Sequence, residues 1–584
     1  MYNAATLNGS KALPFARPKS EGSQPVPLKP LPSSTMLGFL ALTLVSSPVL
    51  HAQLVERPLI SGREAVVTSL EPLASMAGMR ILQEGGNAFD AAVATALAVG
   101  VVDPRMSSLG GNGFATIYVA KTKEVRALNF YGTAPKRATR EFYAGKDYSH
   151  GVLSVPVPSA LKGYEALHKA YGKLPWARVV QPAIELAEGG YVIEQPLAED
   201  FRESEKYLGR IPSTAKVFLP GGRAPKVGEI FRQTDLARTL REVAQQGPDV
   251  FYRGPIGKRI AEYLQANGGV LGADDLAEYQ AKWLTPISTT YRGYTVYTQP
   301  PSSSAIAVLE QLNILEGYDL KALGHNSPQY LHLIGEVIRL AAADRNRYVG
   351  DPDFVKVPVE KLLSKTYAAD RRSLIHADST MPVAVAGDFH QPEDSHTTHL
   401  NVVDAEGNMV ALTQSLGDIF GSWVIADDTG VILGDEMRHL HLDPNDPSRL
   451  APGKRSRSNE SPIIIVKDGT PFMAIGTPGS DGIWQRLVQV IVNVVDFGMD
   501  IQTAITAPRI RSGGNIESGT EIKPLFRVED RIPAATLDAL RAKGFELTIV
   551  NNDYGRVNGI VIDPATKFRL GGADPRENSY ALAW

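Results

Sequence analysis

The residues with the clearest chemical potential are two adjacent threonines, Thr397 and Thr398, which follow a polar segment at 393–396. A threonine hydroxyl is a weak nucleophile that needs a base beside it, and the free α-amine of the same residue is one such base. Thr397 has no free amine while it lies within the chain. Cleavage between His396 and Thr397 would create nucleophile and base on one residue, so the sequence predicts a zymogen that activates itself.

The sequence around Thr397 predicts a β-hairpin that would hold it. Residues 398–403 alternate as in a half-buried strand, 404–408 carry turn residues, and 409–415 read as the return strand. Thr397 would stand at the open end of this hairpin, where a rigid scaffold can position it. The alternative is that the threonine pair is only β-favouring sequence at a strand start. The pair alone favours that alternative, because short motifs often match by chance.

Several further blocks, in order along the chain, resemble the γ-glutamyltransferase family of N-terminal-nucleophile hydrolases. The resemblance includes the Thr-Thr-His start of the hairpin and its turn, and it covers nearly everything from about residue 58 to the C-terminus. So many ordered matches are far more specific than any one of them. The other blocks are 85–94, 109–114, 452–455, 461–462, 476–479, 507–509 and 574–576.

The periodicities predict helices and hairpins rather than a repeated βαβ unit, which fits sheets covered by helices in an α+β protein. Predicted helices are 73–84, 88–101, 362–376 and 483–497, a mainly helical region is 137–348, an exposed linker is 377–395, and predicted hairpins are 114–130, 463–475 and 558–570. The resemblance implies a four-layer αββα sandwich. It also implies a precursor cut into a large subunit, 53–396, and a small catalytic subunit, 397–584, which form a heterodimer.

Amide transfer through a threonine ester needs a nucleophile, a base, an oxyanion hole and a specificity pocket. Thr397 and its freed amine supply the first two. The family carries its oxyanion hole at Gly479 and Ser480, usually as two glycines. This loop precedes a helix, so its backbone N–H groups can stabilise a developing oxyanion. The alternative is an ordinary glycine-rich turn.

Other hydroxyls and arginines match supporting positions of the family. Ser415 falls where the family has a hydroxyl that orients the nucleophile, and Thr413 is interpreted as a core or support hydroxyl. Arg509 and Arg576 match arginines that assist processing or hold the fold. For these two arginines, a structural ion pair is an equally good interpretation.

The substrate pocket is where the sequence departs from the family. The arginine that holds the substrate α-carboxylate in the family is replaced by Tyr131. Five N–H donors of a guanidinium are thereby replaced by the single O–H donor of a phenol. An asparagine is replaced by Gly417, and the acidic residue that meets the α-amine aligns with His439. Glu436 retains a family Gln/Glu position. Of the usual serine pair, Ser458 remains and Asn459 replaces the second.

These replacements leave three hypotheses open. The first is a γ-glutamyltransferase or glutathione hydrolase that cleaves a small γ-glutamyl amide, in which Arg438 or Arg457 replaces the missing carboxylate clamp. The second is an acylase or amidase that acts on a different acyl group. The third is a non-catalytic binding protein, against which the retention of Thr397, Ser415 and Gly479 argues.

Composition excludes several other classes. The chain has 584 residues, of which 43% are hydrophobic and 21% charged, as in ordinary soluble proteins. A net charge of −3 gives no reason to expect nucleic acid or an anionic membrane as partner. There is no cysteine, which excludes disulfides and thiolate chemistry. The sparse histidines, including His396 and His399, are interpreted as polar surface or support residues, so we expect no metal and no cofactor.

The first 52 residues predict a leader. Residues 1–35 are rich in Pro, Ser and Lys, and the apolar run at 36–45 is too short to span a bilayer but has the length of a signal-peptide core. Ala52 could precede the cleavage site. We therefore expect a periplasmic or secreted protein without a membrane span in its mature form. The alternatives are a buried helix or a disordered leader.

Overall fold

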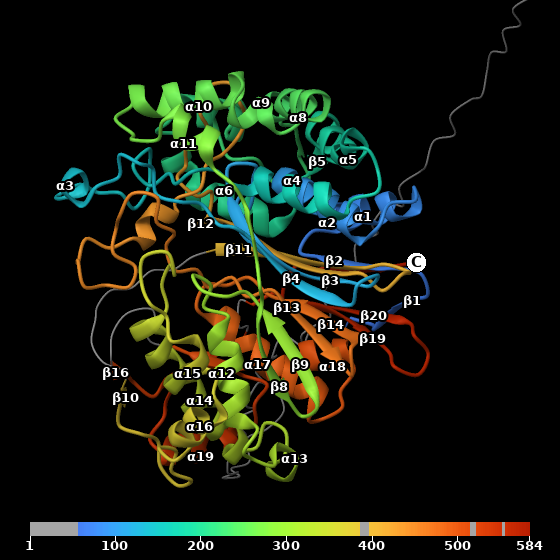
Figure 1. Ribbon diagram of the computed structural model, residues 1–584, viewed down its shortest axis with the longest axis vertical. Helices are drawn as coiled ribbons and strands as arrows, with labels where there is room; N and C mark the ends of the chain where they lie inside the picture. Colours follow the sequence, from blue (N-terminus) through green and yellow to red (C-terminus); the bar gives the residue numbers. More distant parts are fainter. Residues whose placement is uncertain (1–56, 386–395, 514–520, 552–554) are drawn as a thin grey trace, which may run out of the picture. The chain divides into compact units, whose positions relative to one another are not determined.

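Two seven-stranded β-sheets lie face to face between two layers of helices in the computed structural model, which describes residues 57–385, 396–513, 521–551 and 555–584 (Figure 1). The predicted leader lies outside these residues, and the described residues belong to one compact unit. The architecture is therefore the expected αββα sandwich. Among the described helices, none is both long and apolar enough to cross a membrane.

The sheet that contains Thr397 is antiparallel throughout. Its strand order is β21 (Tyr580–Ala583), β2 (Val66–Ser69), β11 (His396–Val403), β12 (Met409–Gly417), β3 (Asn112–Val119), β4 (Glu124–Phe130) and β7 (Lys282–Leu284). The β11–β12 hairpin occupies the middle of the sheet, which confirms the hairpin predicted around Thr397. Neighbouring strands on both sides hold it rigidly in register.

The second sheet is built mainly from the C-terminal part of the chain. Its order is β1 (Ile60–Gly62), β20 (Arg569–Ala573), β19 (Asn558–Ile562), β14 (Thr470–Gly476), β13 (Ile463–Lys467), β9 (Tyr294–Thr298) and β8 (Ile287–Tyr291). The β13–β14 hairpin confirms another prediction. Its turn residues Asp468 and Gly469 both have positive φ, 50° and 72°, as the tight turns of two-residue hairpins require.

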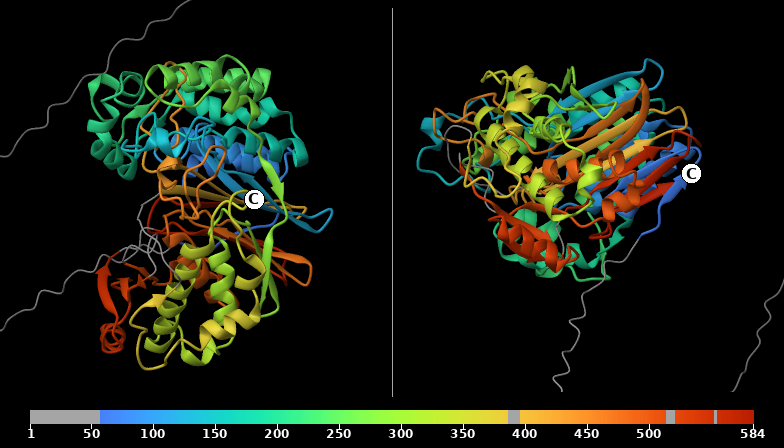
Figure 2. Two further views of the ribbon diagram at one scale, coloured as in Figure 1. Left: turned by 60° about the vertical axis from the view of Figure 1, so that its left-hand side comes forward. Right: turned by 90° about the horizontal axis from the view of Figure 1, so that it is seen from below.

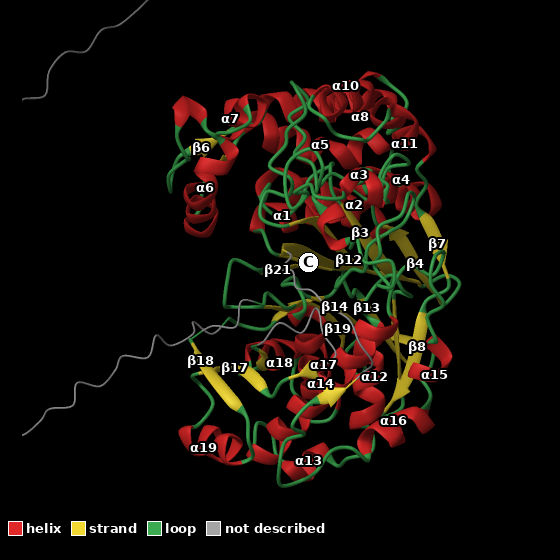
Figure 3. Cartoon of the chain, turned by 90° about the vertical axis from the view of Figure 1, so that its left-hand side faces the viewer, coloured by secondary structure: helices red, strands yellow, loops and turns green. Residues whose placement is uncertain are grey.

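Helices cover the outer face of each sheet, as Figure 3 shows. On the side of the Thr397 sheet lie α1 (Pro72–Gln83), α2 (Ala88–Val102), α4 (Ala160–Tyr171), α5 (Trp176–Gly189) and α8 (Thr234–Gln246). On the other side lie α12 (Ile306–Leu315), α14 (Pro328–Tyr348), α17 (Gly482–Val495) and α18 (Ile501–Thr506). Helix α2 is buried all round, as its apolar sequence predicts, and Asn87 and Asp90 form a capping box at its start.

Shorter elements complete the two helical sides (Figure 2). The remaining helices are α3 (Arg140–Tyr143), α6 (Gln195–Leu208), α7 (Pro212–Phe218), α9 (Asp249–Tyr252), α10 (Pro255–Ala266), α11 (Ala273–Glu278), α13 (Leu320–Leu323), α15 (Val359–Leu362), α16 (Lys365–Arg372) and α19 (Ala534–Ala542). Small sheets are formed by β5 (Tyr191–Val192) with β6 (Ile230–Phe231), by β10 (Ala384–Val385) with β16 (Glu521–Ile522), and by β15 (Ile510–Ser512), β17 (Leu525–Glu529) and β18 (Glu546–Val550).

Three sequence expectations need correction. The region 137–348 is mainly helical, but it also contributes β8 and β9 to the second sheet. The helix expected over 362–376 is shorter: α15 ends at Leu362, and α16 covers only Lys365–Arg372. The linker expected over 377–395 is not fully exposed, because Met381 and Ala384 are buried; its part at 386–395 lies outside the described residues.

The layer between the two sheets is polar at one end and apolar at the other. Alternation along β11 sends Leu400 and Val402 into the core shared with α2. The intervening residues face the second sheet, where Asn401 bonds Asn558. Towards the other end of the strand, Val403 joins an apolar cluster that spans both sheets. A polar inter-sheet end of this kind is suited to chemistry, because buried polar groups need specific partners.

Candidate active site

Thr397 is the second residue of β11, and its side chain is 2% exposed. Ser415 lies directly opposite it in the β11–β12 ladder, and the two hydroxyl oxygens are 3.4 Å apart. The Ser415 hydroxyl accepts a bond of 2.9 Å from the Gly417 amide, which fixes its orientation. The ladder register shifts between His396 and Thr397, so the peptide bond predicted to break is where regular pairing fails.

A row of side chains extends from Thr397 across the sheet. Ser415 pairs with Asn112 of β3, and β3 pairs with β4 so that Gly113 lies opposite Phe130. Tyr131, the next residue after β4, therefore comes beside Asn112. Cross-strand partners share one face of a sheet. The structure thus places Tyr131 and Asn112 on the same face as the Thr397 hydroxyl.

A second row, one pleat further along, supports the first. The ring of His399 bonds the Thr413 hydroxyl at 2.8 Å and the Asn401 carboxamide oxygen at 3.1 Å. Asn401 in turn donates to Asn558 at 2.8 Å. Burial lowers the pKa of His399 to about 3, so its ring is neutral at ordinary pH. His399 is therefore a buried support residue, and Thr413 is its partner.

The Gly479–Ser480 loop follows β14 and leads into α17. Both residues have positive φ, 107° and 56°, which is a conformation that costs a serine more than a glycine. Their carbonyls accept from the amides of Gly482 and Ile483, which makes the loop a tight turn. The loop starts beside β11, because a Cβ on Gly476, the last residue of β14, would lie 2.1 Å from the His399 ring.

Tyr131, Glu436 and Ser458 come together from distant parts of the chain. The Ser456 hydroxyl donates to the Tyr131 phenol at 3.5 Å. Burial, followed by the charge of Glu436, raises the pKa of Tyr131 well above its usual value, and a hydrogen bond from Ser458 offsets part of this rise. Glu436 and Ser458 are therefore also close to the phenol. Burial and the neighbouring Asp435 raise the pKa of Glu436 to about 8.

Sequence reasoning missed Glu460. Its carboxyl group accepts from the Ser458 hydroxyl at 3.4 Å, and its own residue is 2% exposed. Burial, followed by repulsion from Glu436, raises the pKa of Glu460 well above its usual value. The sequence did offer a signal for Glu460: it is an acidic residue two positions after Ser458 and three positions before the buried strand β13.

Asn459, His439 and Gly417 have different surroundings. Asn459 is half-buried and accepts a bond from Arg345. His439 ends a short 3₁₀ helix, Glu436–His439, and its charge lowers the pKa of Glu436. Gly417 has φ of 95°, and a Cβ there would lie 1.8 Å from the Asp435 carboxylate. The asparagine of the family therefore has no space at this position.

Arg438 is engaged by acidic side chains. Its guanidinium donates to Asp418 at 2.6 Å and lies 3.4 Å from Asp435. His150 lies 3.4 Å from Asp435, and ligand atoms of His150, Asp418 and Asp435 lie within 4.8 Å of one another. Because Arg438 already supplies positive charge to this acidic trio, the trio has less need of a metal cation.

Arg509 and Arg576 belong to a buried ion-pair network. Arg509 lies 2.8 Å from Asp574, and Arg576 lies 3.0 Å from Asp574 and 2.8 Å from Glu529. Arg576 also donates to the carbonyls of Ile505 and Ala507 at the end of α18. The geometry matches the structural ion-pair interpretation of both arginines.

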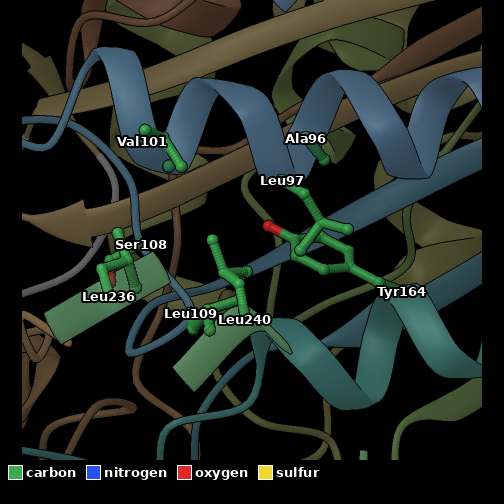
Figure 4. Close-up of a pocket in the computed structure, with 9 residues that line it drawn as sticks. Ala96, Leu97, Val101, Ser108, Leu109, Tyr164, Leu236 and Leu240 are labelled. Atoms are coloured by element: carbon green, nitrogen blue, oxygen red, sulfur yellow. The ribbon is translucent and has the colours of Figure 1, made fainter. Parts of the chain in front are cut away.

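A small apolar pocket lies on the opposite face of the Thr397 sheet, beneath α2 (Figure 4). Tyr164 points into it and donates its hydroxyl proton to Gln414, the β12 residue between Thr413 and Ser415. Because neighbouring strand residues face opposite ways, this pocket is separated by the sheet from the Thr397 hydroxyl. Its lining is Ala96, Leu97, Gly100, Val101, Ser108, Leu109, Tyr164, Leu236 and Leu240.

A threonine at the start of a central strand of an αββα sandwich defines the N-terminal-nucleophile hydrolase class. The gamma-glutamyltranspeptidase family model matches residues 74–584, so the chain belongs to that family. This confirms the resemblance seen in the sequence.

Curated relatives and solved structures agree. The chain is 38% identical over 524 residues to the acylase ACY 1 proenzyme of Pseudomonas sp. strain SE83, covering 87% of this chain and 92% of that one. It is 35% identical over 538 residues to the glutathione hydrolase proenzyme of Escherichia coli K12, covering 88% and 91%. The cephalosporin acylase structure from Bacillus halodurans matches with a TM-score of 0.84 and 33% identity, over 93% of this chain and 99% of that one. The chain is thus an enzyme made as a precursor that is cleaved into two subunits.

Proposed function

We propose that Thr397 is both the processing residue and the catalytic nucleophile of a γ-glutamyltransferase or glutathione hydrolase-like enzyme. The carrying observation is the placement of its hydroxyl, buried against Ser415 at the point where the β11 ladder begins. In the precursor, the Thr397 hydroxyl attacks the His396 carbonyl carbon. The C–N bond breaks and the hydroxyl proton passes to the Thr397 nitrogen, which becomes the free amine. Water then hydrolyses the ester, which gives the His396 carboxylate and restores the Thr397 hydroxyl.

The mature site uses the same groups for amide transfer. The freed amine takes the proton from the Thr397 hydroxyl as its oxygen attacks the substrate carbonyl. Backbone N–H groups of Gly479 and Ser480 stabilise the oxyanion, and Ser415 orients the nucleophile. The protonated amine then gives its proton to the leaving amine. Water or an amine acceptor resolves the acyl-Thr397 ester.

The substrate is a small amide, and two acyl classes remain. A γ-glutamyl group is supported by the retained Glu436 and Ser458 and by the relationship to the Escherichia coli glutathione hydrolase. An acylase acting on another acyl group is supported by the buried Tyr131 and by the relationship to ACY 1 and the cephalosporin acylase. Both use the same nucleophile, so they differ only in the acyl pocket.

A comparison of wild type with Thr397→Ala tests the nucleophile. We expect the wild type to give two bands on a denaturing gel, with the smaller subunit beginning at Thr397 by N-terminal sequencing. Thr397→Ala should give a single uncut band and no anilide hydrolysis. Two bands from Thr397→Ala, with the same new N-terminus, would contradict the proposal. The leader and the export that it predicts are tested separately, by cell fractionation.

A further inference from the structure

Two buried carboxyl groups near Thr397 lie close enough to repel each other, and neither forms an ion pair with a lysine or arginine among the described residues. Glu436 and Glu460 are each 2% exposed. Within the described part of the chain, Oε2 of Glu460 has no hydrogen-bond partner. A buried charge without a partner is very unfavourable, so the pair is suited to a positively charged partner.

A buried amide lies beside the pair. Asn112 is 1% exposed, and its carboxamide oxygen has no hydrogen-bond partner among the described residues. It lies beside Ser415 in the row that contains Thr397, and a hydrogen bond from its side chain partly offsets the burial that raises the pKa of Glu436. Buried polar atoms are almost always bonded, so the orphaned oxygens of Asn112 and Glu460 indicate a missing polar partner.

The charges of the pocket decide which partner fits. Position 131 carries a tyrosine and so provides no cation to bind a carboxylate. Burial, followed by the charges of the two glutamates, raises the pKa of the Tyr131 phenol. A ligand carboxylate would therefore meet two acidic side chains and one neutral donor. A ligand ammonium has three N–H donors, which match Glu436, Glu460 and the Asn112 oxygen.

We propose that Glu460 is a specificity-determining residue that, together with Glu436 and Asn112, binds an ammonium group on the acyl part of the substrate. The enzyme then selects acyl groups that carry an amine and does not require a carboxylate beside it. This inference rests on the proposed Thr397 chemistry. It favours an aminoacyl substrate over a dicarboxylic one such as glutaryl.

Four p-nitroanilides separate the contributions of amine and carboxylate: γ-glutamyl (both groups), 4-aminobutyryl (amine only), glutaryl (carboxylate only) and butyryl (neither). We expect the wild-type kcat/KM for 4-aminobutyryl to lie within about tenfold of γ-glutamyl and to exceed glutaryl and butyryl by about a hundredfold, since a desolvated charge pair discriminates strongly. Glutaryl equal to or better than 4-aminobutyryl would overturn the proposal.

Glu460→Gln removes the charge and keeps the shape. It should lower kcat/KM for the two amine-bearing anilides by about thirtyfold, mainly through KM, and change the ratio of glutaryl to butyryl little. The matched control is Glu310→Gln, another buried glutamate with a raised pKa, located on α12. Glu310→Gln should leave the relative kcat/KM values of the four anilides unchanged. An equal effect of Glu460→Gln on all four substrates would show a structural role only.

A binding measurement covers the case in which Glu460→Gln matures poorly. 4-Aminobutyrate, but not glutarate, should raise the Tm of the mature wild-type enzyme, and a glutarate-only shift would contradict the proposal. Failure of the underlying chemistry has a different signature. In that case Thr397 is not exposed as a new N-terminus and none of the four anilides is hydrolysed, whereas hydrolysis with the wrong preference refutes the ammonium site alone.

Discussion

Two buried clusters of carboxyl groups in this enzyme differ in whether a neighbouring cation compensates their charge. In the arginine–carboxylate cluster, formed by Arg509, Asp574, Arg576 and Glu529, each carboxylate lies against a guanidinium. In the carboxyl pair, Glu436 and Glu460, no such cation is in contact among the described residues. The two arginines lower the pKa of Asp574 although it is fully buried, whereas burial raises the pKa of Glu436 to about 8.

The difference indicates which cluster belongs to the scaffold. A cluster that neutralises its own charge needs nothing from outside, and Arg576 uses its remaining donors on the carbonyls that end α18. A pair that leaves its charge uncompensated is unfavourable for folding alone. Such a pair is expected where a ligand supplies the compensation.

Breaking the compensated cluster should have the largest effect on stability. Asp574→Ala leaves two buried guanidinium groups facing each other, so we expect a loss of about 3–5 kcal/mol in the free energy of unfolding. Denaturant titration measures it. The control is Asp538→Ala, which removes an exposed i,i+3 pair with Arg541 and should change stability by less than about 0.5 kcal/mol. Equal losses for the two variants would contradict the scaffold assignment.

Neutralising one member of the carboxyl pair should increase the stability of the protein rather than reduce it. Glu436 has a folded-state pKa of about 8, above its unfolded value, so it favours the unfolded state increasingly as pH rises from about 4.5 to about 8. Glu436→Gln should therefore raise the free energy of unfolding by about 4–5 kcal/mol at pH 9 and change it little at pH 4. Thermal unfolding at the two pH values measures the effect. A destabilised variant at pH 9 would contradict the assignment.

His399 is an intermediate case, because it is buried and neutral but fully hydrogen-bonded. Its folded-state pKa of about 3 lies below the unfolded value, so its contribution is complete above about pH 6.5 and is lost as pH falls towards 3. From the titration of His399 we expect the free energy of unfolding to fall by about 2 kcal/mol between pH 7 and pH 5. His399→Gln should flatten that part of the pH–stability curve. An unchanged slope would show that another group carries it.

Tyr131→Arg should convert the uncompensated pair into a compensated one. The guanidinium would face Glu436 and Glu460 and provide a carboxylate-binding group, because it sits in the row beside Asn112. We expect the preference for γ-glutamyl over 4-aminobutyryl anilide to rise by about tenfold, and the pKa of Glu436 to fall. Steady-state kinetics and the pH dependence of kcat/KM check both. An unchanged preference would show that residue 131 does not contact the acyl group.

Part of the structure could be predicted from local sequence. The β11–β12 hairpin follows from alternation and its turn residues, and α2 follows from a capping box and an unbroken apolar run. The aligned blocks were specific enough to indicate the αββα sandwich. Thr397, Ser415 and the Gly479 turn could be singled out as candidates, because each lies in a short recognisable segment, and the structure brings Thr397 and Ser415 together.

The chain by itself thus determined its candidate nucleophile, many of its helices and its hairpins, since these depend on neighbours a few residues apart. Only the tertiary structure decided that β8 and β9 join the second sheet, that Asn112 and Tyr131 line up with Thr397, and that Glu460 lies near Glu436. The first two of these arrangements depend on the register between strands that are more than a hundred residues apart. No local pattern encodes that register, because it is set by how the two sheets bury their shared faces.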